Sequence, residues 1–111
     1  MMNKWKVLLH QSVIEFLKSI PEKDETRITQ LFRLLKDLGP SIREPHSKPL
    51  SGFRGLFELR KESDKKVYRV FYFRDGLKFV LIHIYRKQSS KTSLSDMRLA
   101  KRRMEEYFKN K

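Results

Sequence analysis

Residues 56–85 read LFELRKESDKKVYRVFYFRDGLKFVLIHIY, a run in which apolar and polar side chains alternate as they do in β-strands. We expect three strands, over residues 56–61, 66–73 and 77–85. The dipeptide Asp75-Gly76 favours the positive φ angles of a two-residue hairpin turn, and residues 62–65 supply the other turn. The segment therefore predicts an antiparallel meander.

The two turns determine which side chains share a face of this meander. The expected cross-strand pairs are Tyr68 with His83, Arg69 with Ile82, Glu58 with Arg69 and Arg60 with Val67. One face is then almost wholly apolar: Phe57, Leu59, Tyr68, Val70, Tyr72, Phe79, Leu81 and His83. The other is apolar with charges set into it: Glu58, Arg60, Val67, Arg69, Phe71, Val80, Ile82 and Ile84. Charged groups in an apolar setting are costly unless they bind something.

The segments on either side of the meander predict one strand and three helices. Residues 5–9 form a short strand, and residues 11–19 and 22–38 form a helical hairpin that ends at Gly39-Pro40. This hairpin should cover the apolar face. Residues 40–55 form a loop, and Ser93 with Asp96 caps a basic helix over 94–109. Its apolar stripe is Met97, Ala100, Met104, Tyr107 and Phe108. We expect an α/β (α+β) fold in one domain, residues 1–111.

Composition excludes several classes of protein. The chain has 111 residues, 39% of them hydrophobic and 13 aromatic, which suits a folded domain and not a disordered basic tail. It has no Cys, so disulfides, thiolate zinc sites and cysteine nucleophiles are excluded. No run approaches the roughly 18 apolar residues of a membrane span, and the N-terminal apolar runs are too short for a signal peptide. The expected location is the cytoplasm.

Positive charge is concentrated in the second part of the chain. The net charge is +13, from 26 Lys and Arg against 13 Asp and Glu. Residues 43–111 carry 19 of these cations and eight of the acids. Such asymmetry favours a surface that meets nucleic acid or another polyanion, with a merely solvated basic surface as the alternative.

The histidines give no reason to expect a metal or a cofactor. His10, His46 and His83 lack the spacing of metal ligands, and the carboxylates are scattered. His83 is expected to be structural, donating to a buried acceptor, with a catalytic base as the alternative.

Cations are the remaining candidates for chemistry. Arg60 and Arg69 share a face, and Lys87 and Lys91 follow the third strand. RNA cleavage by its own 2′-hydroxyl needs a base, stabilisation of a dianionic phosphorane and a proton for the leaving 5′-oxygen. A cluster of Arg and Lys can supply all three. In the alternative interpretation, Arg69 pairs with Glu58 and the other cations are solvated.

Several segments together resemble the HigB-like, phage-derived branch of the RelE/ParE toxin superfamily. They are KPL at 48–50, GLFELR at 55–60, VYRVFYF at 67–73 and Lys87 with Lys91-Thr92, followed by a basic helix. The resemblance implies a toxin that is encoded beside an antitoxin, often a helix-turn-helix (HigA-like) protein. Most characterised relatives cleave mRNA in the ribosomal A site without a metal.

The resemblance also implies roles for individual residues. Arg60 matches a basic position of the first motif strand, and Arg69 matches an arginine that contacts the scissile phosphate. Lys87 matches a residue that stabilises the transition state or leaving group. Lys91 is a further candidate for proton transfer. Positions expected to bind RNA are Lys48, Arg86, Arg98, Lys101 and Arg102. Glu58 replaces a Lys of RelE, and the chain has Ser93 and Asn110-Lys111 where relatives have Tyr or His, so the general acid and base remain unassigned.

Two other functions share this pattern. A ParE-like protein would bind DNA gyrase and perform no RNA chemistry, although Arg60, Arg69 and Lys87 disfavour that interpretation. An inactive basic RNA-binding module is the third possibility, and it is favoured by Glu58 and by Asn110-Lys111 in place of the C-terminal Tyr-His of some relatives. The leading hypothesis is a ribosome-dependent mRNA endonuclease of a toxin-antitoxin pair.

Overall fold

The computed structural model describes residues 4–88, 91 and 93–111. Its elements in chain order are β1 (Lys6–Leu9), α1 (Gln11–Ser19), α2 (Glu22–Leu38), the 3-10 turn η1 (Gly39–Ser41), β2 (Ser47–Pro49), β3 (Phe57–Ser63), β4 (Lys66–Asp75), β5 (Lys78–Arg86) and α3 (Leu94–Lys109). The bounds of α1, α2 and α3 agree with those expected from periodicity and capping. In α3, the backbone N–H of Asp96 donates to Ser93 Oγ, which is the expected cap.

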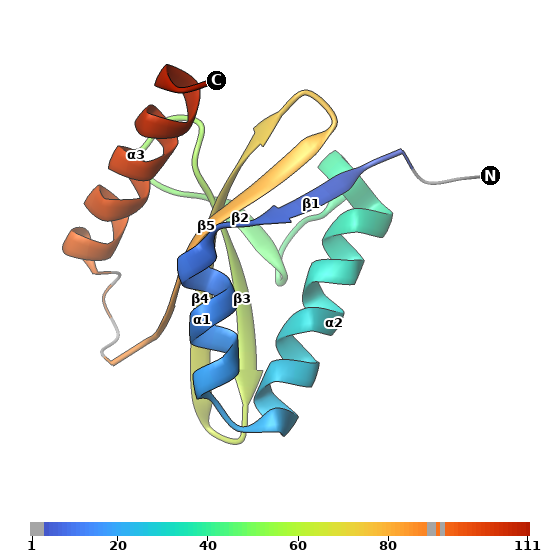
Figure 1. The fold of residues 1–111 in the computed structure, drawn as a ribbon. Coiled ribbons are helices and arrows are strands. Elements are labelled where there is room, and N and C mark those ends of the chain that lie inside the picture. Colours follow the sequence, from blue (N-terminus) through green and yellow to red (C-terminus); the bar gives the residue numbers. More distant parts are fainter. Residues whose placement is uncertain (1–3, 89–90, 92) are drawn as a thin grey trace.

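The strands form one mixed sheet between two helical layers. The strand order is β1-β5-β4-β3-β2, with β1 parallel to β5 and every other pair antiparallel. Helices α1 and α2 lie on one side of this sheet, and α3 lies on the other (Figure 1). The expected α+β fold with a mostly antiparallel sheet is therefore confirmed.

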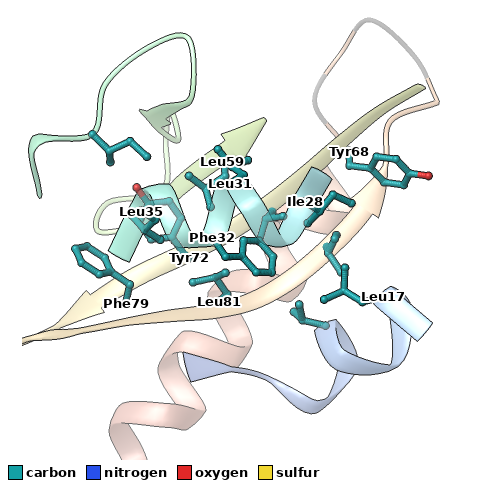
Figure 2. Packing of buried hydrophobic residues seen from close by; sticks show 14 residues of the cluster. Leu17, Ile28, Leu31, Phe32, Leu35, Leu59, Tyr68, Tyr72, Phe79 and Leu81 are labelled. Atoms are coloured by element: carbon teal, nitrogen blue, oxygen red, sulfur yellow. The ribbon is translucent and has the colours of Figure 1, made fainter. Parts of the chain in front are cut away.

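The helical hairpin buries its apolar side against the expected face of the sheet. Ile28 and Leu35 of α2 are fully buried, and they share one cluster with Leu59, Tyr72 and other strand residues (Figure 2). Burying a side chain of this size stabilises the fold by about 1.5–3 kcal/mol. This cluster joins α1, α2 and the sheet.

Gly39 ends α2 for two separate reasons. Its backbone N–H donates to the carbonyl of Leu35, and its φ angle is +56°, which side chains with a Cβ adopt at a cost. A Cβ at this position would also lie 2.5 Å from Nε1 of Trp5. The indole ring therefore occupies the space that any other residue would need.

The turn between β3 and β4 is tighter than expected. Ser63 pairs with Lys66, so the turn consists of Asp64 and Lys65 alone, with φ angles of +49° and +69°. These positive angles match the twist of a two-residue hairpin. The register moves by two residues, and Arg60 therefore lies opposite Arg69, where Val67 was expected. An even shift leaves each side chain on its expected face.

A β-bulge changes the faces at the end of β5. Close to the β4–β5 turn, Tyr72 pairs with Leu81, but the next pair along is Phe71 with His83, so Ile82 is an extra residue. Beyond the bulge, His83 lies on the α3 side and Ile84 belongs to the core under α1 and α2. Both assignments are the reverse of those expected, because a uniform register was assumed.

His83 ties β5 to α3 at this point. Its Nε2 lies 2.5 Å from Oδ1 of Asp96, and its Nδ1 lies 3.3 Å from Nη1 of Arg103. A guanidinium only donates, so Nδ1 is the acceptor and Nε2 carries the hydrogen that goes to Asp96. The expected structural role of His83 as a donor is present, on the opposite face of the sheet.

The segment expected to be a loop contains a short edge strand. Residues Ser47–Pro49 form β2, with Lys48 opposite Glu58. The strand has only three residues, one of which is Pro49, and so few residues show no alternating pattern. It therefore forms through pairing with β3 and not through its own propensity. It extends the charged face of the sheet by one strand.

Helix α3 covers part of that second face. Ala100 is fully buried among Phe71, Phe73 and Val80, with Met97, Met104 and Tyr107 packed around them. The Phe108 ring also lies against Phe73, although Phe108 is 46% exposed. This packing confirms the apolar stripe expected for α3.

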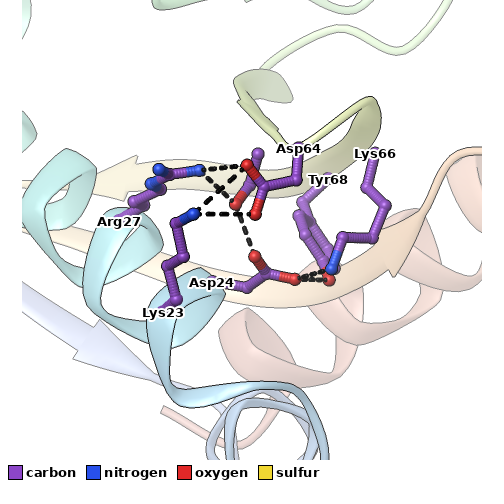
Figure 3. Close-up of polar contacts among 7 residues, drawn as sticks. Lys23, Asp24, Arg27, Asp64, Lys66 and Tyr68 are labelled. Carbon is purple, nitrogen blue, oxygen red and sulfur yellow. Dashed lines mark hydrogen bonds and ion pairs between the residues drawn. The ribbon is translucent and has the colours of Figure 1, made fainter.

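A buried carboxylate fixes the start of α2 to the β3–β4 hairpin. Asp24 accepts hydrogen bonds from Ser63, Lys66 and Tyr68, and the Tyr68 Oη distance is 2.6 Å. In the turn of this hairpin, Asp64 forms ion pairs with Lys23 and Arg27 of α2 (Figure 3). These bonds lower the pKa of Asp24 well below its usual range, chiefly through Lys66, Ser63 and Tyr68.

Candidate active site

Two arginines lie next to each other on the sheet face that carries charged groups. Arg60 on β3 is directly opposite Arg69 on β4. Like charges that face each other across strands destabilise a sheet. An anion bound between the two guanidinium groups would relieve this repulsion, and a phosphate matches their planar donors. The pair is therefore a candidate phosphate site.

Glu58 holds one of these arginines in place. Its Oε2 lies 3.3 Å from Nη1 of Arg69, and its Oε1 lies 3.7 Å from Nζ of Lys48. Glu58 is 1% exposed and Arg69 is 4% exposed. The ion pair that the sequence left open as an alternative is thus present. It fixes the guanidinium of Arg69. Arg60 forms its own ion pair with the exposed Glu62 at 2.8 Å, so two carboxylates face the four cations Lys48, Arg60, Arg69 and Lys87, and the group stays cationic.

Lys87 belongs to the same cluster. Its backbone N–H donates to the carbonyl of Val67 at 2.7 Å, which continues the β4–β5 pairing past the end of β5. Burial lowers the pKa of Lys87, and the positive charges of Arg69 and Arg60 lower it further, while Glu58 opposes them. A lysine with a lowered pKa releases its proton more readily, which suits a proton donor.

A cleft opens next to these residues at the β2–β3 edge. Its volume is about 530 Å³. The lining side chains are mostly polar or charged: Glu44, Pro45, His46, Ser47, Lys48, Glu58, Arg60, Lys61 and Glu62. The predicted residues Arg60 and Lys48 therefore share one open cavity, which has room for a nucleotide. Arg69 and Lys87 adjoin it through Arg60 and Glu58.

Sequence comparison places this chain among known proteins. A family model described as phage-derived, Gp49-like protein matches residues 15–105. The chain belongs to the Gp49-like family of phage-derived proteins. This confirms the resemblance to the phage-derived branch of the RelE-type toxins. No curated protein matches the sequence significantly.

Solved structures with the same fold come from toxin-antitoxin systems. The RelE–RelB complex of Pyrococcus horikoshii is similar at 24% identity and a TM-score of 0.56, over 75% of this chain and 93% of the other. The RelB–RelE complex of Methanococcus jannaschii has 14% identity and a TM-score of 0.56, over 70% and 87%. A mutant of Escherichia coli toxin RelE in the free state has 12% identity and a TM-score of 0.57, over 72% and 80%. At these identities the likeness concerns the fold.

The remaining predicted residues of the Gp49-like chain are spread over other surfaces. Arg86 lies opposite Tyr68, which places it on the α1–α2 side of the sheet, away from Arg60. Lys91 is exposed in the segment between β5 and α3, and Thr92 of the same motif lies outside the described residues. Lys87, in contrast to Arg86, lies next to the arginine pair: the charged groups that act on its pKa are Arg69, Arg60, Glu58 and Lys48.

The basic residues of α3 form a separate surface. Arg98, Lys101 and Arg102 are all exposed, on the side of the helix opposite its buried residue Ala100. The third Arg of the helix, Arg103, is not on this surface, since it donates to Ser12 Oγ and to the carbonyl of Ile82. RNA binding by the exposed three remains a prediction.

Two residues near the arginine pair were not selected from the sequence. His46 lies just before β2, where its carbonyl accepts from the backbone N–H of Arg60 at 3.1 Å. Tyr85 on β5 lies opposite Arg69, and burial raises its pKa while the Arg69 charge opposes the rise. His46 could not be found because β2 was expected to be a loop. Tyr85 could not be found because the bulge alters the register of β5.

The described residues show neither a metal site nor a membrane helix. Within residues 4–88, 91 and 93–111, no three His, Asp or Glu side chains gather as metal ligands would. Among the helices in this part of the chain, none combines the length and apolar character needed to cross a bilayer.

Proposed function

We propose that this protein is the toxin of a toxin-antitoxin pair, and that it inhibits translation by cleaving mRNA on the ribosome. The observation that carries the proposal is the pair Arg60 and Arg69 beside Lys87, with Arg60 lining an open cleft that the other two adjoin. Membership of the Gp49-like family and the RelE-type fold support it. Toxicity would be exerted in the cytoplasm, where ribosomes translate.

The proposed reaction uses charge and proton transfer from the protein alone. Arg60 and Arg69 hold the scissile phosphate and stabilise the dianionic phosphorane as it forms. Lys87 gives a proton to the leaving 5′-oxygen, and its lowered pKa favours this transfer. Lys48 binds the neighbouring phosphate in the cleft, and Lys91 assists by charge neutralisation. No metal or other cofactor is needed for any of these roles.

A second part of the proposal concerns the partner. Two of the solved structures with this fold are complexes of a RelE toxin with its RelB antitoxin. We propose that an antitoxin encoded beside this protein, of the helix-turn-helix HigA-like type, binds it and blocks the cleft. Acidic segments of such a partner would match the net charge of +13.

The experiment is induction of the protein in a bacterial host, with primer extension on a translated and an untranslated copy of one mRNA. We expect growth arrest and cuts in the translated copy only. Arg60→Ala should abolish both, since Arg60 is exposed and its loss leaves the core intact. Arg33→Ala, an exposed arginine on α2, is the matched control and should behave as the wild type.

Arg69→Ala should also abolish growth arrest. A melting curve must show that this variant is folded, because the substitution also affects stability. Removal of Arg69 leaves Glu58 buried without this partner, which costs about 3–5 kcal/mol. Full toxicity of folded Arg60→Ala and Arg69→Ala would contradict the assignment. Growth arrest with intact mRNA and accumulated DNA breaks would instead identify a gyrase inhibitor. No arrest by the wild type would leave an inactive RNA-binding module.

A further inference from the structure

Three side chains form one row across the charged face of the sheet, and His46 adjoins one end of it. The Arg60-to-His46 backbone bond and the β2–β3 register place His46 opposite Arg60. Arg60 lies opposite Arg69, and Arg69 lies opposite Tyr85. Cross-strand partners share a face, so two guanidinium groups and a phenol follow one another from β3 to β5, and His46, in the turn just before β2, lines the cleft together with Arg60.

Cleavage of RNA by its 2′-hydroxyl places a geometric demand on such a row. The attacking 2′-oxygen and the leaving 5′-oxygen lie on opposite sides of phosphorus, so the base and the acid must flank the phosphate. A phosphate held by Arg60 and Arg69 has His46 on its β2 side. Lys87 lies on its β5 side. The two groups that can exchange protons therefore flank the candidate phosphate site.

We propose that His46 is the general base of the cleavage reaction, working across the phosphate from Lys87; this inference rests on the proposed function. Neutral His46 takes the proton of the 2′-hydroxyl while the 2′-oxygen bonds to phosphorus. The bond from phosphorus to the 5′-oxygen breaks, and the Lys87 ammonium gives that oxygen its proton. The products are a 2′,3′-cyclic phosphate and a 5′-hydroxyl, and charge and protons balance.

The neighbouring groups are less suited to this role. Glu58 is held by Arg69 and Lys48, and it lies beneath the surface at 1% exposure. Burial raises the pKa of the Tyr85 phenol, which makes it reluctant to ionise. His46 is exposed, lines the cleft with Arg60, and carries an imidazole, the side chain that most often transfers protons in enzymes.

The test measures single-turnover cleavage of a ribosome-bound mRNA by purified His46→Gln. We expect a rate about 100-fold or more below that of the wild type, with ribosome binding unchanged. His10→Asn is the matched control: His10 lies at the start of α1, where it caps the helix, and Asn keeps that cap.

A substrate with sulfur in place of the bridging 5′-oxygen separates base from acid. A thiolate leaves without a proton, so this mRNA should restore cleavage by Lys87→Ala and leave His46→Gln slow. Rescue of His46→Gln by the sulfur substrate, or cleavage of ordinary mRNA within about threefold of the wild type, would overturn the role of His46. A wild-type protein that cuts no mRNA would overturn the proposed function, and every variant would then be equally silent.

Discussion

At the scale of single residues, Asp24 shows how one buried carboxylate can make stability depend on pH. Lys66, Ser63 and Tyr68 all donate to it, and together they lower its pKa (Figure 3). The unfolded chain therefore binds a proton at Asp24 at a higher pH than the folded chain does. Asp24 has a pKa of roughly 4 in the unfolded chain, and the stabilisation it contributes is fully present above that pH. This stabilisation is lost progressively as the pH falls from there toward the lower pKa of the folded chain.

We therefore expect Asp24→Asn to be less stable than the wild type at pH 7 and to lose less stability on acidification. The measurement is the melting temperature from pH 7 to pH 2.5. Asp37→Asn, an exposed acid on the same helix, is the control and should follow the wild-type curve. Parallel curves for Asp24→Asn and the wild type would show that Asp24 is not responsible for the acid sensitivity.

At the scale of elements, the β3–β4 hairpin carries local strain in its turn. Lys65 has a φ angle of +69°, in the left-handed region where a Cβ costs about 1–2 kcal/mol. Lys65→Gly should therefore raise the free energy of unfolding, by about 0.5–1 kcal/mol once the greater entropy of the unfolded glycine is included.

Urea unfolding measures this change, and Lys61→Gly is the control. Lys61 lies in the middle of β3, opposite Tyr68, where a glycine should cost about 0.5–1 kcal/mol. A loss of stability in Lys65→Gly as large as that in Lys61→Gly would contradict the assigned turn.

The bulge in β5 is an element that periodicity could not reveal. Apolar residues continue through Leu81, Ile82 and Ile84, so the sequence is compatible with either register. The register that β5 adopts depends on α3, because His83 reaches Asp96 and Arg103 only from the α3 side of the sheet. A tertiary contact thus decides the faces of a strand whose own residues leave them open.

At the scale of the whole molecule, exposed cations lie on two separate surfaces, although Glu44, Glu58 and Glu62 lie beside Lys48, Arg60 and Lys61 in the first of them. One is the cleft around Arg60, and the other is the exposed side of α3 with Arg98, Lys101 and Arg102. If the α3 surface meets RNA phosphates, each contact releases counterions and adds to the salt dependence of binding.

The double variant Lys101→Ala, Arg102→Ala should bind ribosomes more weakly. The slope of log affinity against log salt should fall in magnitude by roughly one per lost phosphate contact, about two in total. Lys18→Ala, Arg33→Ala removes two exposed cations from α1 and α2 and should keep the wild-type slope. Equal slopes in all three proteins would exclude α3 from the RNA interface.

The sequence by itself determined the three helices, the four longer strands and their order, but not β2 or η1. The 3.6-residue periodicity of α2, the stop at Gly39 and the cap at Ser93 are local, and local rules hold for them. The β4–β5 hairpin forms as expected, but its turn is Gly76-Leu77 and not Asp75-Gly76, because Asp75 pairs with Lys78; the expected pairs Tyr68–His83 and Arg69–Ile82 are therefore wrong. The sequence also placed Arg60 and Arg69 on one face, because an even error in register preserves faces.

Only the tertiary structure decided how those residues meet. The two-residue β3–β4 turn brought Arg60 opposite Arg69, and the pairing of β2 with β3 brought His46 next to Arg60. The bulge turned His83 toward α3. Each of these outcomes depends on contacts between segments distant in the chain, whose free energy exceeds the weak preferences of a turn or a three-residue strand.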